Sequence, residues 1–460
     1  MRVLLATVLV LGALASHAEA GEKGFGPARS ALLKGLRSKS VDDRVQAVFA
    51  LDGFDSAEAA RTLVRFVLAR DDRAPVIVAG IQLTGALKSP EAVAVLVAEA
   101  KKGHWRTRAR VYEALGTVEG EAALSALLLA AYDEDPRVRI SVLLALEHAK
   151  GDQAVVVVGD ALKAREWPVR SAAIYALGRM KAGDAVVPLI RRLGAEGEKG
   201  RLLDDTRVAL RRITAKDFGV DGRRWTDWYA KERANEAVDL GPYREPPAAS
   251  VGLAGVTSSA SRVVFVLGVN DTMNKKIRIP AGKEAPADVK KEGGAEYKRW
   301  LAVETKLDLA RLWIARAIDR LAPETRFDIV TIGASTNSVF SGFVPATKAN
   351  REKGKKRVLS LSASGNANLY GGLRKIFTLT SKDPLDPAAL ISGPEVVYFL
   401  GDGAADEGMI RSAWEAFAEV ERWNRYRQIR FNCFGMGDHD PRVLADLAGM
   451  VPDGAMLSLP

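Results

Sequence analysis

Cysteine and histidine are nearly absent from this 460-residue sequence, which contains one cysteine and four histidines. The lone Cys433 can neither form a disulfide within the chain nor build a thiolate zinc cluster. The histidines form no His-x-x-x-His pair, and neither a Gly-x-x-x-x-Gly-Lys phosphate loop nor a Gly-x-Ser-x-Gly nucleophile turn occurs. We therefore predict a non-enzymatic protein stabilised by apolar burial, with Cys433 packed in a core.

Long apolar runs are equally scarce, and the longest one lies at the start of the chain. Arg2 precedes an apolar stretch from Val3 to Ala15, and Ala18-Glu19-Ala20 provides a small-x-small cleavage site. This arrangement is typical of a secretory signal peptide over residues 1–20, whereas a membrane span needs roughly 20 apolar residues. We expect an exported protein, periplasmic or extracellular, without stable membrane insertion. A membrane anchor is the alternative.

Acidic residues are outnumbered, since 67 Lys and Arg against 57 Asp and Glu give a formal net charge of +10. Two basic clusters stand out, Lys353 to Arg357 and the aromatic-containing segment from Arg422 to Arg430. Basic side chains beside aromatic rings can bind single-stranded nucleic acid, but arginines at the carboxyl end of a helix also complement its dipole. Because an exported protein meets little nucleic acid, we expect no nucleic-acid partner.

The first half of the sequence is built from a repeat of 31 to 33 residues. Each repeat contains an apolar helical pattern that closes on a leucine, and four of these leucines have an arginine seven positions earlier. The leucines are Leu51, Leu83, Leu115, Leu146, Leu177 and Leu210, and the arginines are Arg44, Arg108, Arg139 and Arg170. Two helices of this length cannot bury their own apolar face, so neighbouring repeats are expected to stack into a solenoid.

These repeats resemble HEAT repeats, particularly the short bacterial kind, over roughly Gly26 to Thr214, and we count six units. The second and sixth units carry Val76 and Leu203 in place of the arginine. We interpret the arginine as structural, pairing with acidic or carbonyl groups of an adjacent repeat. A ligand-binding ladder is the alternative. The resemblance implies an all-α solenoid that binds proteins.

Two segments separate the repeats from the second half of the chain. The aromatic residues between Trp225 and Tyr229 have helical spacing and predict a helix that closes the end of the solenoid; an aromatic ligand platform is the alternative. The following stretch, rich in Pro, Gly, Ala and Ser, predicts a linker. We therefore place the solenoid with its closing helix at residues 21–236, the linker at 237–260 and a second domain at 261–460.

The second domain alternates short apolar strands with amphipathic helices. Strands are expected near Val263, Phe327, Val396, Ile429 and Met456, with a short edge strand at 338–344. Helices are expected at 300–321, 409–425 and 440–448 and after Gly365, with a polar, lysine-rich excursion at 274–298. This alternation, with tight turns from strand to helix, predicts an α/β doubly wound, mostly parallel sheet.

Three loops of this domain resemble those of von Willebrand factor A (VWA) domains, which have a Rossmann-like fold. Val263 to Met273 (VVFVLGVNDTM) matches the opening strand and loop, Asn366 to Tyr370 the second loop, and Gly401 to Gly403 the third. The resemblance covers nearly all of Ser261 to Leu459. It implies a protein-binding module in which the loop edge holds a divalent cation, the metal-ion-dependent adhesion site.

The metal-binding residues of that family are only partly retained here. Gly268, Asn270 and Thr272 stand where the family has Asp, Ser and Ser, Ala367 replaces a threonine, and Asp402 matches outright. Magnesium requires near-octahedral oxygen ligands with enough negative charge to replace its waters. We therefore predict that the domain has no metal cofactor. A weak Mg²⁺ or Ca²⁺ site at Asp402, Thr272 and Asn270 is the alternative.

Polar loop residues that follow parallel strands meet at one edge of a sheet. We call this set the rim: Gly268, Asn270, Asp271, Thr272, Asn366, Asn368 and Asp402. Asp271 could restore the missing charge, and Asn366 or Asn368 could offer carbonyl oxygens. We expect an exported scaffold protein that binds protein partners non-covalently through the solenoid's concave face and the rim. Cation-dependent, adhesin-like binding is the alternative.

Overall fold

A computed structural model describes most of the chain. It covers residues 24–149, 151–194, 200–232, 251–277, 285–404, 410, 413–451 and 453–459. The chain forms two compact units, Met1–Leu189 with Ala209–Lys216, and Ile190–Val208 with Asp217–Pro460. The predicted signal peptide and most of the predicted linker lie outside the described residues. Within the described ranges, no helix has both the length and the apolar character needed to cross a bilayer.

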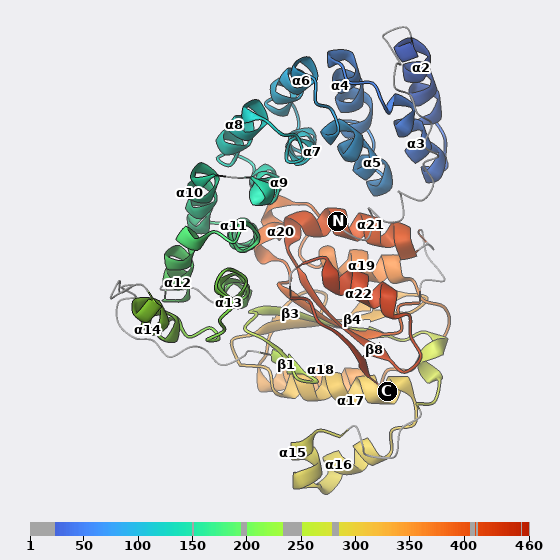
Figure 1. Cartoon of the computed structure of the whole chain (residues 1–460). Coiled ribbons are helices and arrows are strands. Elements are labelled where there is room, and N and C mark those ends of the chain that lie inside the picture. The colour runs from blue at the N-terminus through green and yellow to red at the C-terminus, as the bar shows by residue number, and fades with distance from the viewer. Residues whose placement is uncertain are drawn as a thin grey trace. The chain divides into compact units, whose positions relative to one another are not determined.

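The first unit is a stack of helix pairs. Its helices are α2 (Phe25–Gly35), α3 (Val41–Val48), α4 (Ala57–Leu63), α5 (Ala74–Gly85), α6 (Pro90–Ala100), α7 (Trp105–Leu115), α8 (Glu121–Ala130), α9 (Pro136–Ala145), α10 (Asp152–Asp160) and α11 (Trp167–Met180). Another pair, α12 (Val186–Gly194) and α13 (Arg201–Thr214), is divided between the two units. Figure 1 shows α4, α6, α8 and α10 in one row and α5, α7, α9 and α11 in another. Six helix pairs are present among the described residues, so the predicted all-α solenoid is confirmed.

Helix starts in this unit follow the turn signals of the sequence. Ser89 and Asp135 each precede a proline, and their side chains accept hydrogen bonds from the backbone amides of Ala92 at 3.3 Å and Arg137 at 2.9 Å. Proline suits the first helical position because a backbone N–H at that position would have no hydrogen-bond acceptor within the helix. The leucines that close the repeats are all buried, so consecutive repeats share a continuous core.

Three of the four repeated arginines pair with an acidic residue of the next repeat. The pairs are Arg44–Asp71 at 3.3 Å, Arg108–Asp133 at 2.8 Å and Arg139–Glu166 at 2.7 Å. The fourth, Arg170, donates from Nη1 to the backbone carbonyls of Ala164 at 2.6 Å and Arg165 at 2.9 Å. The predicted pairing with an adjacent repeat is confirmed for three of the arginines, whereas the two carbonyls that Arg170 contacts lie in its own repeat.

The most exposed large apolar side chains of the described residues lie on two neighbouring helices of the first unit. Leu129 on α8 is 71% exposed, Tyr132 directly after α8 is 62% exposed, and Val156 on α10 is 64% exposed. We call these three residues the α8–α10 patch. Single apolar residues on a surface are usual, whereas a group on adjacent helices is typical of a binding surface.

In the described residues, the second unit contains a seven-stranded sheet in the order β5-β4-β3-β7-β8-β9, with β6 paired to β4. The parallel strands are β3 (Arg262–Gly268), β4 (Arg326–Ile332), β7 (Val396–Gly401), β8 (Arg430–Met436) and β9 (Met456–Leu459). The antiparallel strands are β5 (Thr336–Ser338) and β6 (Val344–Pro345). The predicted α/β doubly wound, mostly parallel sheet is confirmed.

Helices cover both faces of this sheet (Figure 1). One face carries α17 (Lys306–Asp319) and α18 (Lys348–Leu359), and the other carries α19 (Leu369–Phe377), α21 (Ala413–Arg427) and α22 (Pro441–Gly449). On β3, Phe265 and Leu267 belong to the core on the α17 side, whereas Val264 and Val266 belong to the core on the α19 side. Strict alternation along the strand therefore supplies both cores.

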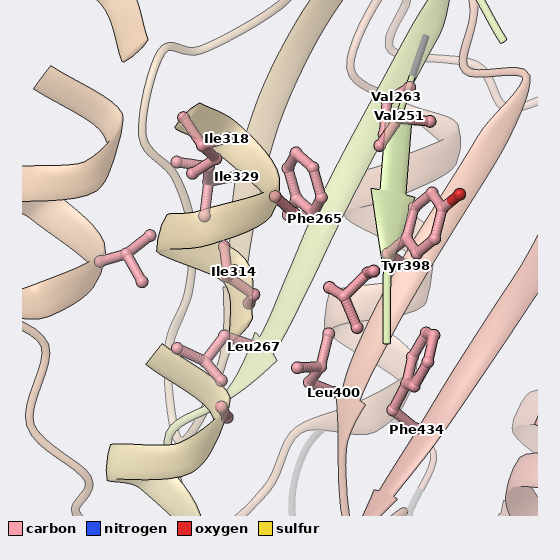
Figure 2. Close-up of a cluster of buried hydrophobic side chains, with 14 of the residues drawn as sticks. Val251, Val263, Phe265, Leu267, Ile314, Ile318, Ile329, Tyr398, Leu400 and Phe434 are labelled. Atoms are coloured by element: carbon pink, nitrogen blue, oxygen red, sulfur yellow. The ribbon is translucent and has the colours of Figure 1, made fainter. Parts of the chain in front are cut away.

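Figure 2 shows the core on the α17 side, where side chains of β3 lie beside Ile314 and Ile318 of α17. Tyr398 from β7 and Phe434 from β8 complete this layer. Cys433 is fully buried in the opposite core, and burial raises the pKa of its thiol. Its predicted role as a packed core residue is confirmed.

A buried charged network lies at the amino ends of the strands. Arg201 is 1% exposed and donates to the Asp205 carboxylate at 3.1 Å and to the backbone carbonyl of Glu395, directly before β7, at 3.3 Å. Asp205 also pairs at 2.6 Å with Arg430, the first residue of β8. All four residues belong to the second unit. Pairing with opposite charge avoids the penalty of isolated buried ions.

One predicted helix of this unit is wrong in its extent. The helix expected over 300–321 is two helices, α16 (Gly294–Leu301) and α17, because Thr305 begins a new one. The Thr305 hydroxyl accepts from the Asp308 amide at 3.2 Å, and the Asp308 carboxylate accepts from the Thr305 amide at 3.1 Å. This capping box fixes the start of α17. The lysine-rich excursion itself contains α15 (Ala287–Glu292).

Several elements were not predicted at all. Residues 251–258, inside the expected linker, form a hairpin of β1 (Val251–Leu253) and β2 (Val256–Ser258) that buries Val251 and Leu253. α18 and α20 (Pro387–Ser392) were also missed. α18 buries only Gly354 and Val358, so its apolar periodicity is too sparse to reveal a helix.

The predicted closing helix is α14 (Gly222–Glu232). Its Trp225 is fully buried, packs edge-on against Phe218 with ring centroids 4.9 Å apart, and donates from Nε1 to the Gly219 carbonyl at 2.9 Å. The aromatic residues of this segment therefore serve one another as packing partners. That α14 closes the end of the solenoid stays a prediction.

We expect Arg108→Ala to lower the free energy of unfolding by about 1–3 kcal/mol, because it leaves the partly buried Asp133 carboxylate without its two-point partner. Lys163→Ala is the matched control, since Lys163 and Asp160 form an exposed pair at 3.4 Å. Its effect should stay within about 0.5 kcal/mol. Urea unfolding followed by circular dichroism measures both, and equal losses would contradict a linking role for Arg108.

Candidate functional site

Parallel pairing brings the carboxyl ends of β3, β4, β7 and β8 to one edge of the sheet, where the loops that follow them meet. The Asp271 amide donates to the Gly365 carbonyl at 2.8 Å. The Asn368 amide donates to the Gly333 carbonyl, just beyond β4, at 2.9 Å. The structure therefore brings together the first two rim loops, as the sequence predicts.

Three rim side chains form one hydrogen-bonded chain that also includes the third loop. Asn270 is 2% exposed and donates from Nδ2 to the Thr272 hydroxyl, which in turn donates to Oδ2 of Asp402. The other carboxylate oxygen of Asp402 accepts from the Ala404 amide at 3.2 Å. Because these polar groups are satisfied within the protein, the loops after β3 and β7 hold each other in place.

The remaining rim residues are either recessed or exposed. Asn368 is recessed, and its Oδ1 accepts from the Gly371 amide at 2.8 Å and so caps α19. Ala367 is 2% exposed, and its side chain supplies no oxygen. Asp271 and Asn366 are exposed, so these two are the rim side chains most accessible to a partner.

A buried lysine lies beside the rim, and the sequence analysis missed it. Lys306 is the first residue of α17 and is 2% exposed. Its Nζ donates to the backbone carbonyl of Asp438 in the loop after β8, and its side-chain stem lies against Gly437. Burial lowers the pKa of the Lys306 ammonium below its usual range, and the Asp402 carboxylate acts in the opposite direction.

Three side chains stand at the metal positions of the family that the second domain resembles. Asn270, Thr272 and Asp402 are hydrogen-bonded to one another, and Asp402 supplies the one carboxylate of the three. Across the described part of the chain, no group of three or more His, Cys, Asp or Glu side chains is arranged to hold a metal ion.

Asp438, His439 and Asp440 form a polar segment between β8 and α22. His439 lies with Nδ1 2.6 Å from the Gly437 carbonyl and Nε2 3.1 Å from the Ser458 hydroxyl, so its ring connects this loop to β9. Asp440 accepts from the Arg442 amide at 2.9 Å and caps α22. These contacts assign structural roles to the histidine and to the second aspartate.

Two protein families match this chain. The HEAT repeats family matches residues 67–147 and 124–211, and the von Willebrand factor type A domain family matches residues 303–451. The chain combines HEAT repeats with a VWA domain. Both are typically non-catalytic interaction modules. The presence of these two domains therefore points to a protein-interaction or scaffold role.

Several solved structures are similar to part of this chain. A von Willebrand factor type A protein from Catenulispora acidiphila is 17% identical with a TM-score of 0.30, over 44% of this chain and 40% of that one. Proximal thread matrix protein 1 from the mussel byssus is 14% identical with a TM-score of 0.27, over 43% and 41%. Human deoxyhypusine hydroxylase in complex with glycerol is 16% identical with a TM-score of 0.22, over 46% and 94%.

The chain thus spans about 40% of the length of the first two structures. A search of curated proteins finds no match.

We expect Thr272→Val to lower the free energy of unfolding by about 1–3 kcal/mol, because it removes the hydroxyl that joins Asn270 to Asp402. Thr272→Ser keeps a hydroxyl and should lose less than about 1 kcal/mol. Guanidinium unfolding followed by tryptophan fluorescence compares the two variants. Equal losses would show that the methyl group, rather than the hydrogen bonds, is what matters at this position.

Proposed function

We propose that this chain is an exported scaffold protein that captures a protein partner at the rim of its VWA domain without a bridging metal ion. The HEAT and VWA domains support the interaction role. The signal-peptide pattern of the first twenty residues supports export to a periplasm or to the outside of the cell. The scarcity of catalytic motifs supports a protein that binds without chemistry.

The observation that carries this proposal is the convergence of polar loops that are already fixed by their own hydrogen bonds. The chain from Asn270 through Thr272 to Asp402 orders the loops after β3 and β7 before any partner arrives. A surface ordered in advance loses little conformational entropy on binding. Asp271 and Asn366 are exposed and offer the partner a carboxylate and an amide.

Metal independence is supported by the same contacts. A divalent cation needs several oxygen ligands and enough negative charge to replace its waters. Here Thr272 already donates its hydroxyl proton to Asp402, and a buried ammonium lies nearby. The side chains of Asn270, Thr272 and Asp402 are therefore hydrogen-bonded to one another.

Cation-dependent, adhesin-like binding is the second candidate. It is favoured by one observation, that Asp402 and Thr272 are both retained and contact each other directly. The two candidates differ in what a chelator does to partner binding.

We expect titration of the mature chain with Mg²⁺, Ca²⁺ or Mn²⁺ at millimolar concentration to give no binding heat beyond dilution in isothermal calorimetry, because Asp402 is the one carboxylate of the three side chains at the family's metal positions and provides too little charge. Partner capture from an extract of the exported fraction should be the same with and without EDTA. A micromolar dissociation constant for any of the three ions, or capture abolished by EDTA, would favour the second candidate.

We expect Asp271→Ala and Asn366→Ala together to weaken the affinity for a captured partner by about tenfold or more, since both side chains are exposed at the rim. The matched control is Leu129→Ser with Val156→Ser, which changes the α8–α10 patch instead. Biolayer interferometry with the purified partner measures both. If only the patch variants lose affinity, the partner binds the solenoid and the rim proposal is wrong.

A further inference from the structure

Lys306 occupies a position that disfavours a positive charge in two ways. It is 2% exposed, so its ammonium has lost most of its contact with water. It is also the first residue of α17, at the positive end of the helix dipole. A buried charge with two penalties needs a compensating negative partner.

The loop after β8 connects Lys306 with Asp402 of the rim. The Lys306 ammonium donates to the Asp438 carbonyl, and the Asp440 amide of the same loop donates to the Asp402 carbonyl at 3.3 Å. Lys306 and Asp402 are therefore held by one short loop. Burial lowers the pKa of the Lys306 ammonium, as does the exposed Lys275, whereas the Asp402 and Asp438 carboxylates act to raise it.

The loop after β3 approaches the same place from the other side. Its 3₁₀ turn, Asp271–Asn274, packs against α17, and the backbone amide of Lys306 donates to the Lys275 carbonyl at 3.1 Å. Within that turn, Thr272 donates its hydroxyl proton to Asp402. Asp402 thus accepts from a hydroxyl on one loop and acts to raise the pKa of the buried Lys306 ammonium.

We propose that the Lys306 ammonium is the resident cation of this VWA domain, balancing Asp402 and holding the rim loops together in the role that a divalent ion has in the family. One positive charge against one carboxylate leaves the pair neutral, whereas a divalent ion added to it would leave two uncompensated positive charges. The same lysine therefore assembles the rim and repels metal. The inference rests on the proposed metal-independent function and names the group responsible for it.

A double-mutant cycle tests the pairing of Lys306 with Asp402. Lys306→Met and Asp402→Asn each leave one charge without its partner, and we expect each to lower Tm by about 4 °C or more. The double variant removes both charges and should recover at least about half of the summed loss. Lys275→Met, an exposed lysine beside the same loop, is the control and should leave Tm nearly unchanged.

Losses that simply add in the double variant would overturn the proposal, as would a loss in Lys275→Met as large as that in Lys306→Met. If Lys306→Met does not fold, Lys306→Gln takes its place in the same cycle. If neither single variant folds, the proposal still requires Lys306→Met with Asp402→Asn to fold, and failure of that protein overturns it.

A second experiment asks whether Lys306 keeps metal out when the missing ligands are restored. A Cβ added at Gly268 would lie 3.4 Å from Oδ1 of Asn270 and 3.5 Å from Cα of Gly401, so the Cβ of Gly268→Asp makes ordinary van der Waals contacts. With Ala367→Thr added, we expect the dissociation constant for Mn²⁺, measured by electron paramagnetic resonance, to be at least about tenfold lower with Lys306→Met than with Lys306 present. Equal constants would overturn the proposal.

These outcomes are separable from failure of the proposed function. The Tm cycle and the Mn²⁺ titration need no partner, so an additive cycle with intact rim-dependent capture would remove Lys306 from its role and leave the function standing. Capture that depends on a chelatable metal would instead remove the function.

Discussion

The parallel pairing of β3 between β4 and β7 is the constraint on which the rim depends. In this register Gly268 lies opposite Ile332 of β4, and Leu267 lies opposite Leu400 of β7, so the three strands end almost level. The loops after β3 and β7 therefore start at the same height. A slip of one residue would exchange the two apolar faces of β3, and both cores would oppose it.

The hydrophobic cores thus position polar residues that contribute nothing to them. β3 and β7 are buried over nearly their whole length, as is usual for central parallel strands. The rim begins where burial ends. The Thr272–Asp402 contact joins segments 130 residues apart, and their proximity follows from the strands that precede them.

How much the sequence reveals depends on whether a feature repeats or is local. Strands such as β7 read as continuous apolar runs, and the solenoid repeats its leucines, so both were predicted from pattern alone. α18 was not, because only Gly354 and Val358 of it are buried. The break before α17 depends on one capping box, which a long apolar periodicity conceals.

The residues of the candidate site likewise divide into those that the sequence reveals and those that only the fold reveals. Thr272 and Asp402 could be identified from the sequence because each lies in a loop motif of a known family, whereas Lys306 lies outside those motifs. One signal did exist: Lys306 precedes the buried Leu309 and Ala310 by three and four residues and so shares their helical face. A charged residue on a core-facing position marks a candidate, but its partners at 402 and 438 can be identified only from the fold.

The arginine–acid contacts of the first unit have a mechanical consequence. Each joins one repeat to the next in sequence, and Arg110 adds another connection by donating from Nη1 to the Leu68 carbonyl at 2.5 Å and the Asp71 carbonyl at 3.1 Å. Because each of these contacts reaches only the adjacent repeat, the stiffness of the solenoid is set separately at each joint between repeats. Such a solenoid bends gradually under load. The loss of one arginine–acid contact softens a single joint, while the other joints keep their stiffness.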